Sequence, residues 1–300
     1  KRHYKLIIDE HFVKNSNSKI SIVRLATHYN DIFRISRHLK YLKKLGYKVF
    51  VNLMQINIIN ERELIKALKE LKESKSVDVF YFADSFGNMK PHNVKNICKT
   101  IKKNWSNSFG IHTHDNCGYA LENSLTAIKF GAKWVDATVQ GMGRGAGNVS
   151  TETLLCELSR MGFKKFNPDP VYSLSQSFFI DLKKKYNWGK SIYYHLAAIN
   201  NIHQTYIQEL LIDDRYSHDQ ILNIINSLTK TNSRSFNSET LKELINDRVN
   251  LKNAWNARDW CLNKNVVLLG QGQTIKTYSE DIKKFIRNKK CIVLSLNINK

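Results

Sequence analysis

The sequence predicts an α/β fold in which parallel strands alternate with helices, and three observations carry that prediction. Short β-branched runs recur along the first 165 residues, and most are followed by a stretch with the apolar spacing of a helix. Glycines such as Gly46, Gly131 and Gly162 close several of these stretches, as expected at helix C-termini. The strands read as nearly continuous apolar runs, which is typical of a sheet covered on both faces. We therefore expect right-handed β–α–β crossovers and parallel pairing.

Six strands are expected before the alternation breaks near residue 166. Their ranges are 5–9, 21–27, 48–54, 78–84, 109–114 and 134–139. The expected helices are 32–45, 62–73, 91–104, 119–130 and 150–161. A closed barrel of this kind has eight strands. We therefore expect a (β/α)8 TIM barrel whose first two β–α units lie outside this sequence, which opens on Lys1. An open, doubly wound sheet of six strands is the alternative.

The remainder of the chain predicts two further parts. Strand signals disappear after Pro168, and helices are expected at 173–186, 191–211, 219–230 and 238–255. A strand at 265–269, a helix at 280–287 and a strand at 291–296 then form one β–α–β unit. Such a unit cannot close its own core, so it is expected to begin a second α/β domain. The predicted organisation is a partial barrel over 1–165, a helical appendage over 166–263 and the start of a Rossmann-like domain over 264–300.

Composition restricts the class of protein. The net charge of +21 comes from lysines scattered over the polar faces of nearly every expected helix, which we interpret as solvated faces and not as a nucleic-acid site. The apolar runs are too short for a membrane span or a signal peptide. The five cysteines lie far apart without CxxC spacing, so we expect reduced thiols and a cytoplasmic protein. A homo-oligomer is compatible with these features.

The most specific motif is the run His112-Thr113-His114-Asp115-Asn116 at the end of an expected strand. His112 and His114 are two residues apart, so both imidazoles point to the same side of the sheet. At the carboxyl end of a barrel strand, that side faces the active-site mouth. Two convergent imidazoles can bind a metal ion. A hydrogen-bonded pair of structural histidines is the alternative.

A glycine-rich loop follows the next expected strand, with the sequence Gly141-Met142-Gly143-Arg144-Gly145-Ala146-Gly147-Asn148. Glycines at these positions allow the backbone to approach a ligand closely. Asn148 can offer an amide oxygen towards the same mouth. Taken alone, the loop is also compatible with a tight structural turn. The neighbouring histidines favour a metal site.

Four segments resemble one known family in their order and spacing. They are residues 23–28 (VRLATH), 81–89 (YFADSFGNM), 112–116 (HTHDN) and 141–148 (GMGRGAGN). Over roughly residues 5–162 the chain is similar to the 4-hydroxy-2-oxovalerate aldolase group of the DRE-TIM metallolyase superfamily. That superfamily also contains hydroxymethylglutaryl-CoA lyase, isopropylmalate and homocitrate synthases and the carboxyltransferase domain of pyruvate carboxylase.

The resemblance implies roles for particular residues. His112 and His114 are expected to bind the divalent ion, with Asn148 as a further ligand or near neighbour. Ser85, with Asp84 beside it, is expected to contact the substrate carboxylate. His28, at the end of a strand, is the best-placed candidate for an acid or base, with His195 and His203 as others. The family's Arg-Asp-Gly motif, which supplies a third ligand and an arginine for the enolate, is not found near the start of this sequence.

The implied function is that of a class II pyruvate aldolase that acts on a small 4-hydroxy-2-oxo acid and yields pyruvate and an aldehyde, or runs the reverse reaction. Mn²⁺ or Mg²⁺ is the expected ion, because chelation of an oxo acid is rich in oxygen, and Zn²⁺ is also compatible. Without the Arg-Asp pair, we expect this sequence alone to turn over little substrate. A Claisen-type enzyme that uses an acyl-CoA and an inactive barrel that serves as a scaffold are the alternatives.

A second, weaker motif lies near the end of the chain. Gly270, Gly272 and Thr274 form a turn between an expected strand and an expected helix, where a helix N-terminus could seat a phosphate of a bound cofactor. An ordinary turn is the alternative. The order of barrel, helical region and GxGxT turn resembles aldolase-domain proteins associated with bacterial surface-polysaccharide synthesis, and sugar-acid biosynthesis is a related setting.

Overall fold

A computed structural model describes residues 11–165, 167–213, 215–248, 260–270 and 274–295 of the chain. The chain divides into two compact units, residues 1–245 and 246–300, each of which is considered by itself. The expected strand at 5–9 lies outside the described residues. The domain limits expected from the sequence at 165 and 263 remain a prediction.

The first unit is built on a parallel sheet, as predicted. Its strands are β1 (Ile22–Thr27), β2 (Lys48–Leu53), β3 (Val79–Asp84), β4 (Ser108–Thr113) and β5 (Trp134–Val135), and they pair in the order in which they occur along the chain. A doubly wound sheet would show a reversal of strand order. The five described strands show none, so the doubly wound alternative is wrong for this sheet.

The sheet is strongly curved. In a flat sheet, β1 and β5 would lie four strand spacings apart, or roughly 19 Å. Yet Arg24 Nη1 on β1 lies 2.7 Å from Asp136 Oδ2, just beyond β5. The rings of Phe50 on β2 and Trp134 on β5 have centroids 5.0 Å apart. Side chains of one face therefore meet across the concave side, which is the curvature of a barrel wall.

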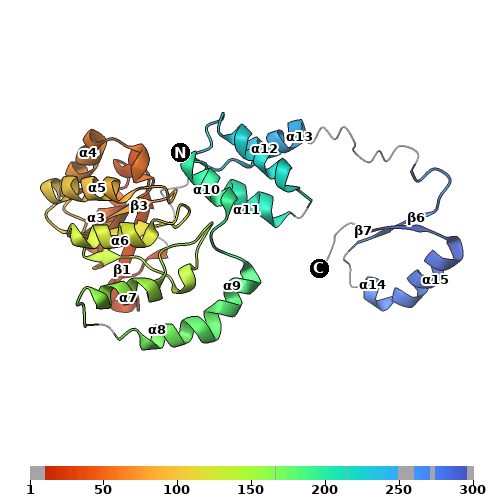
Figure 1. Ribbon diagram of the computed structural model, residues 1–300, viewed down its shortest axis with the longest axis horizontal. Coiled ribbons are helices and arrows are strands. Elements are labelled where there is room, and N and C mark those ends of the chain that lie inside the picture. The colour runs from red at the N-terminus through yellow and green to blue at the C-terminus, as the bar shows by residue number, and fades with distance from the viewer. Residues whose placement is uncertain (1–10, 166, 214, 249–259, 271–273, 296–300) are drawn as a thin grey trace. The chain divides into compact units, whose positions relative to one another are not determined.

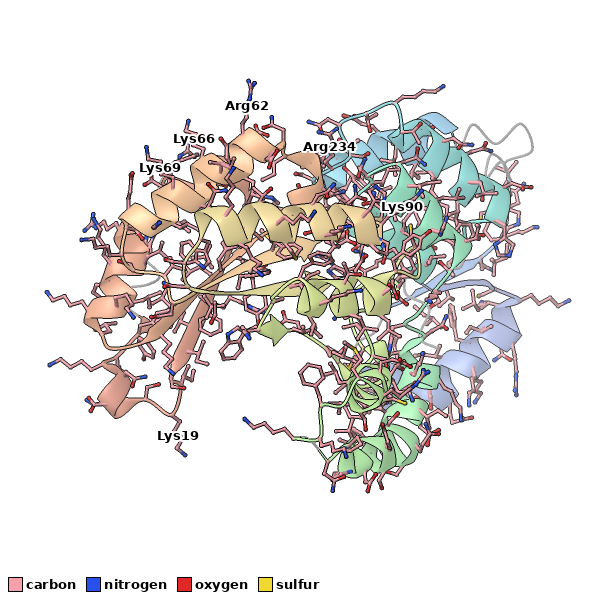
Figure 2. All side chains as sticks on the ribbon, turned by 60° about the vertical axis from the view of Figure 1, so that its left-hand side comes forward. Lys19, Arg62, Lys66, Lys69, Lys90 and Arg234 are labelled. Carbon is pink, nitrogen blue, oxygen red and sulfur yellow. The ribbon has the colours of Figure 1, made fainter. Side chains whose placement is uncertain are left out.

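Six helices accompany these strands. They are α2 (Tyr29–Ile32), α3 (Ser36–Lys44), α4 (Glu61–Glu73), α5 (Pro91–Asn104), α6 (Ala120–Lys129) and α7 (Thr151–Arg160), and Figure 1 shows α3 to α6 beside the strands. The apolar stripes of α2 to α6 meet the outer sheet residues in one core, which includes Leu68, Phe80 and Ile101. The buried Leu154 of α7 packs in a separate small cluster. Asn60 begins α4 with a capping box. Charged side chains lie on the exposed face of α4, where Figure 2 shows Arg62, Lys66 and Lys69 projecting outward.

Three expected elements differ from the structure. The expected helix at 32–45 is split into α2 and α3 by a turn at Phe33–Ile35. The expected strand at 134–139 is confined to β5, because the backbone turns into the short 3₁₀ helix η3 (Val139–Gly141). The expected helix at 191–211 breaks where Asn201 takes a left-handed conformation with φ of 54°.

The helical region has two parts. The first consists of α8 (Asp169–Leu174), the π-helical η4 (Ser175–Phe179) and α9 (Ile180–Tyr186), and it contacts α7 and η3. The second consists of α10 (Ile192–Ile199), α11 (Gln204–Ile212), α12 (His218–Leu228) and α13 (Ser238–Arg248), and it contacts the loops after β2 and β3. Tyr206 is fully buried in its core. Gln204 Nε2 donates to the carbonyl of Ser85 at 2.9 Å, and Gln55 Nε2 donates to the carbonyl of Arg234 at 2.8 Å. These contacts join the helices to the mouth of the sheet.

The second unit contains β6 (Val266–Leu269), α14 (Thr274–Thr277), α15 (Ser279–Lys289) and β7 (Ile292–Ser295). β6 and β7 pair in parallel. The β–α–β order that the sequence predicts is therefore present, and β6 and β7 form a two-stranded sheet of their own.

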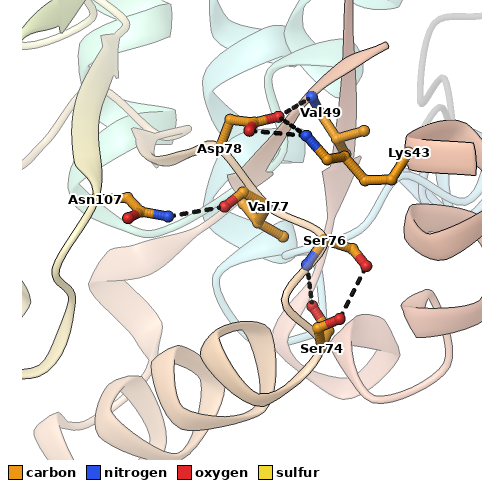
Figure 3. A network of polar contacts seen from close by, with 7 residues as sticks. All are labelled: Lys43, Val49, Ser74, Ser76, Val77, Asp78 and Asn107. Carbon is orange, nitrogen blue, oxygen red and sulfur yellow. Dashed lines mark hydrogen bonds and ion pairs between the residues drawn. The ribbon is translucent and has the colours of Figure 1, made fainter. Parts of the chain in front are cut away.

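A polar network fixes the amino ends of β2 and β3 (Figure 3). Lys43 Nζ on α3 lies 2.9 Å from both carboxylate oxygens of Asp78, and the backbone N–H of Val49 donates to Asp78 Oδ2 at 2.7 Å. Asn107 donates to the carbonyl of Val77 at 3.1 Å. One carboxylate therefore links a helix to two strands at the end of the sheet opposite the mouth.

Replacing Asp78 with Ala should lower the free energy of unfolding by about 1–2 kcal/mol, because it removes charge-assisted hydrogen bonds. The side chains of Lys43 and Asp78 are each about one-third exposed to solvent, which limits the loss. Urea unfolding measures the change. Asp181→Ala is the matched control, because its ion pair with Lys184 is largely exposed and should contribute less than about 0.5 kcal/mol. Equal effects of the two substitutions would contradict the role given to Asp78.

Candidate metal centre

Two imidazoles converge at the carboxyl end of β4. His112 is near the end of the strand and His114 follows it, and their ring centroids are 5.1 Å apart with planes at 80°. His114 is buried, with 8% of its surface exposed, whereas the His112 side chain keeps 23%. The i, i+2 spacing thus brings both rings to one place, as the sequence predicted.

His114 has the protonation state that a metal ligand requires. Burial lowers the pKa of His114 to about 3, and the nearby His112 and Arg144 act in the same direction, so His114 is neutral at pH 7. Its Nδ1 atom is buried and has no hydrogen-bond partner among the described residues. A neutral, unpaired ring nitrogen costs free energy in a protein interior unless something binds it.

Asp136 orients the second imidazole. His112 Nδ1 lies 2.8 Å from Asp136 Oδ2, and the same carboxylate accepts a hydrogen bond from Arg24 Nη1 at 2.8 Å. Burial alone would raise the pKa of Asp136, but the hydrogen bonds from His112 and Arg24 hold it below its ordinary value. The ionised carboxylate fixes the Nδ1–H tautomer of His112 and leaves Nε2 available, as second-shell carboxylates do at metal sites.

The glycine-rich loop brings Asn148 to the histidines. Asn148 forms a backbone bridge with His114, and its N–H donates to the carbonyl of Gly141 at 3.1 Å. Gly147 has φ of 86°, and a Cβ there would lie 2.0 Å from the Gly141 oxygen, so only glycine permits this closure. The side-chain N–H of Asn148 donates to the carbonyl of Met142, which leaves Oδ1 buried without a partner in the described part of the chain.

These observations test whether the residues fit a divalent ion. Two imidazoles and an amide oxygen are ligands that Mn²⁺, Mg²⁺ and Zn²⁺ accept in different degrees. Two of the atoms that would bind the ion, His114 Nδ1 and Asn148 Oδ1, are buried and lack a hydrogen-bond partner among the described residues. The fit is therefore good but incomplete, because the described residues include no group of three or more His, Cys, Asp or Glu side chains placed to hold an ion.

Ser85 and Asp84, two of the residues expected to act near a substrate, lie in different settings. Ser85 Oγ, at the end of β3, accepts from the backbone N–H of Gln55 at 2.9 Å and keeps its own proton to donate. Asp84 is fully buried, and its carboxylate accepts from the N–H groups of Asn88 and Met89. Burial raises the pKa of Asp84 to about 7. Asp84 thus shapes the turn after β3 beside Ser85, and its expected role next to the substrate carboxylate stays a prediction.

Histidines from two further elements lie near the mouth. His28 is the N-cap residue of α2, directly after β1, and it contributes with burial and Arg144 to a lowered pKa of about 4 for His203. His203 precedes α11 and is also close enough to affect the pKa of His114. His195 is an exposed residue of α10, and it is not among the groups that shift the pKa of His114 or of His203.

Three charged residues of this site were missed in the sequence. Arg24 and Asp136 are separated by 112 positions, although an arginine inside the apolar run of β1 was a signal that could have been followed. Arg144 stands within the quoted glycine-rich loop, yet only the structure places it near His114 and His203. Among the described residues, no acid forms an ion pair with Arg144, whereas Asp136 is paired with Arg24 and Asp115 with Lys190.

The expected phosphate-binding turn belongs to the second unit. Gly270 follows β6, Thr274 begins the four-residue helix α14, and Gly272 lies outside the described residues. The phosphate or cofactor site at this turn therefore stays a prediction. No helix in the described part of the chain is long and apolar enough to cross a membrane.

Comparison with known proteins adds to this geometry. The family described as HMGL-like matches residues 11–176, which is more than half of the chain. A 4-hydroxy-2-oxovalerate aldolase of Carboxydothermus hydrogenoformans is 38% identical over 143 residues, covering 48% of this chain and 42% of that protein. The chain thus spans less than half the length of the curated relatives that it matches.

Solved structures agree with the fold. The N-terminal domain of a candidate aldolase from Bacteroides vulgatus is 34% identical, with a TM-score of 0.60, and the match covers 68% of this chain and 66% of that one. The carboxyl transferase domain of Rhizobium etli pyruvate carboxylase has a TM-score of 0.62 at 13% identity, covering 76% of this chain and 42% of that one. At that identity the second likeness concerns the fold alone.

Proposed function

Because the chain belongs to the HMGL-like family of DRE-TIM proteins, we propose that it acts as a divalent-metal-dependent pyruvate aldolase. Such an enzyme cleaves a 4-hydroxy-2-oxo acid to pyruvate and an aldehyde, or joins the two. The observation that carries the proposal is that His114 Nδ1 and Asn148 Oδ1 are both buried without a hydrogen-bond partner among the described residues, while the rings of His112 and His114 lie 5.1 Å apart. Relatives named 4-hydroxy-2-oxovalerate aldolase support the choice of reaction.

The proposed mechanism assigns each residue one task. His112, His114 and Asn148 would hold the ion, with Mn²⁺ or Mg²⁺ preferred. When bound, the ion supplies a Lewis acid that stabilises negative charge on the oxo-acid oxygen. Arg144, whose charge no described acid offsets, would attract the anionic oxo acid. Ser85 Oγ can donate a hydrogen bond to the carboxylate, and His28 is the proposed base for the 4-hydroxyl proton.

The test is a coupled assay for pyruvate release from 4-hydroxy-2-oxo acids, run on the protein with added Mn²⁺ and on its His114→Ala variant. We expect only slow release by this chain, because the Arg-Asp pair that the resemblance implies is not found in its sequence, and a further loss of at least about 100-fold in the variant. Metal binding without pyruvate release from any 4-hydroxy-2-oxo acid would favour an inactive scaffold. Equal release by both proteins would show that the catalytic groups lie elsewhere.

The carboxylate behind His112 gives a separate prediction. Asp136→Asn should weaken Mn²⁺ binding by about 10–100-fold, the usual effect of losing a second-shell partner, because His112 loses the group that fixes its tautomer. Isothermal titration of the chain with Mn²⁺ measures the change. The control is Asp31→Asn, which alters an exposed ion pair between Asp31 on α2 and Arg34. This substitution should leave the affinity for Mn²⁺ unchanged. Unaltered binding by Asp136→Asn would remove Asp136 from the site.

A further inference from the structure

An asparagine-rich pocket lies apart from the candidate metal centre. It has a volume of about 730 Å³ and is formed by the first turns of α4 and α5 together with the turn before α11. None of the candidate metal ligands lines it. Six of its 14 lining residues are asparagines: Asn57, Asn60, Asn88, Asn93, Asn96 and Asn201. They come from the short helix η2 (Ile56–Ile58), the cap of α4, the loop after β3, α5 and the α10–α11 turn.

Composition alone does not explain this gathering. Asparagine makes up 31 of the 300 residues of the chain, about one in ten, whereas it makes up six of 14 here. Part of the set has a structural task. Asn57 Nδ2 donates to Asn88 Oδ1 at 2.9 Å, and Asn88 Nδ2 donates to the carbonyl of Ala198 at 2.6 Å. These bonds hold the helical region against the loops after β2 and β3, and they shape the wall of the pocket.

The remaining hydrogen-bonding groups of the asparagines are both donors and acceptors. Asn60 and Asn93 each use Oδ1 to accept a backbone N–H, from Glu63 and Lys90 respectively, so that their amino groups are left over. Asn57 Oδ1 is buried and has no partner among the described residues. Asn96 is exposed, and no hydrogen bond to another described residue occupies its amide. The asparagines of the pocket therefore offer both donors and acceptors, and none of them carries a charge.

The other lining groups narrow the chemistry of the ligand. One acid, Glu61, and one base, Lys99, line the pocket, so the lining carries no net charge. Thr100 Oγ1 donates to Glu61 Oε1 at 2.7 Å, which leaves Oε2 as another acceptor. A phosphate would need donors only, and a metal ion would need several anionic oxygens. A hydroxyl group both donates and accepts, and the apolar side chains of Leu64 and Ile97 can contact C–H groups.

We propose that this pocket binds a neutral polyhydroxylated ligand, a saccharide unit, at a site separate from the metal centre. The amide groups bind its hydroxyls, and the apolar side chains between α4 and α5 contact its ring carbons. A ligand that lies between the sheet loops and the turn before α11 also fits the general preference of small-molecule sites for such junctions.

Saturation-transfer NMR on the intact chain tests the proposal, with EDTA present to exclude the metal centre. The probes are D-glucose, D-galactose and N-acetyl-D-glucosamine, with inorganic phosphate as the anionic comparison. Asn96→Phe places a ring in the groove, and Asn96→Leu removes the amide at similar volume. Asn226→Phe, on an exposed position of α12, is the matched control. Thermal unfolding verifies that each variant folds.

We expect saturable binding of at least one sugar by the wild type and the Asn226→Phe protein, weakened about tenfold or more by both Asn96 substitutions. Phosphate should not compete. The proposal is overturned if no sugar of the panel binds saturably, if the Asn96 and Asn226 variants behave alike, or if phosphate displaces the sugar. Because EDTA is present throughout, these outcomes are independent of whether the aldolase proposal holds.

Discussion

Replacing both His112 and His114 with Ala is expected to reduce the affinity for Mn²⁺ by more than about 100-fold, beyond the loss caused by removing a second-shell partner. The physical reason is that the two imidazoles are the nitrogen donors that converge at the end of β4, with ring centroids 5.1 Å apart. Asn148 Oδ1 alone is a weak, neutral ligand. Isothermal titration and bound-metal analysis of the chain measure the result.

His92→Ala is the matched control for this experiment. His92 is an exposed histidine on α5, outside the candidate metal centre, so its loss should leave the metal content unchanged. The double variant must keep the unfolding midpoint of the wild type to within a few degrees for the comparison to count. Equal metal content in the wild type and the double variant would refute the metal centre.

Phe80→Ala should lower the free energy of unfolding by about 3–5 kcal/mol, a large part of the stability of a typical domain. Phe80 is fully buried in the middle of β3, and β3 pairs with β2 on one side and with β4 on the other. Its ring contacts the helix layer near Trp105, with centroids 6.1 Å apart. Truncation would leave a cavity that the two fixed neighbouring strands cannot close.

The comparison for Phe80 is Phe178→Ala, which alters a ring that is 54% exposed. Its expected effect is within about 0.5 kcal/mol. Urea unfolding followed by far-ultraviolet circular dichroism measures both. Similar small losses for the two variants would show that the core between the sheet and the helices is not the main source of stability.

The sequence was sufficient for local structure and for residues close together in the chain. The α5 helix has the bounds that its Pro91 start and its periodicity predict. The pairing of β6 with β7 also followed from one short β–α–β pattern. The convergence of His112 and His114 needed only the alternation of side chains along a strand. In each case the determining interaction spans a few residues or one crossover.

The direction of a side chain or of the backbone at the end of an element could not be read in the same way. Asp84 looked like a residue of the mouth because it ends β3, but its carboxylate is turned to the N–H groups of Asn88 and Met89. The direction of a side chain at the end of a strand depends on the turn that follows. The alternation of side chains along the strand does not determine that turn. The helix break at Asn201 also escaped, because its left-handed backbone accompanies a side-chain network with Asn57 and Asn88.

The sequence by itself determined the parallel α/β class, the order of the elements, and the pair of histidines that can hold an ion. The tertiary structure alone decided what surrounds them. Curvature of the sheet brings Arg24 from β1 to Asp136 beyond β5, and Asp136 in turn orients His112. Burial and loop closure leave His114 Nδ1 and Asn148 Oδ1 unpaired. The reason is physical: alternation and periodicity act along a few residues, whereas burial and charge pairing depend on groups that only folding brings together.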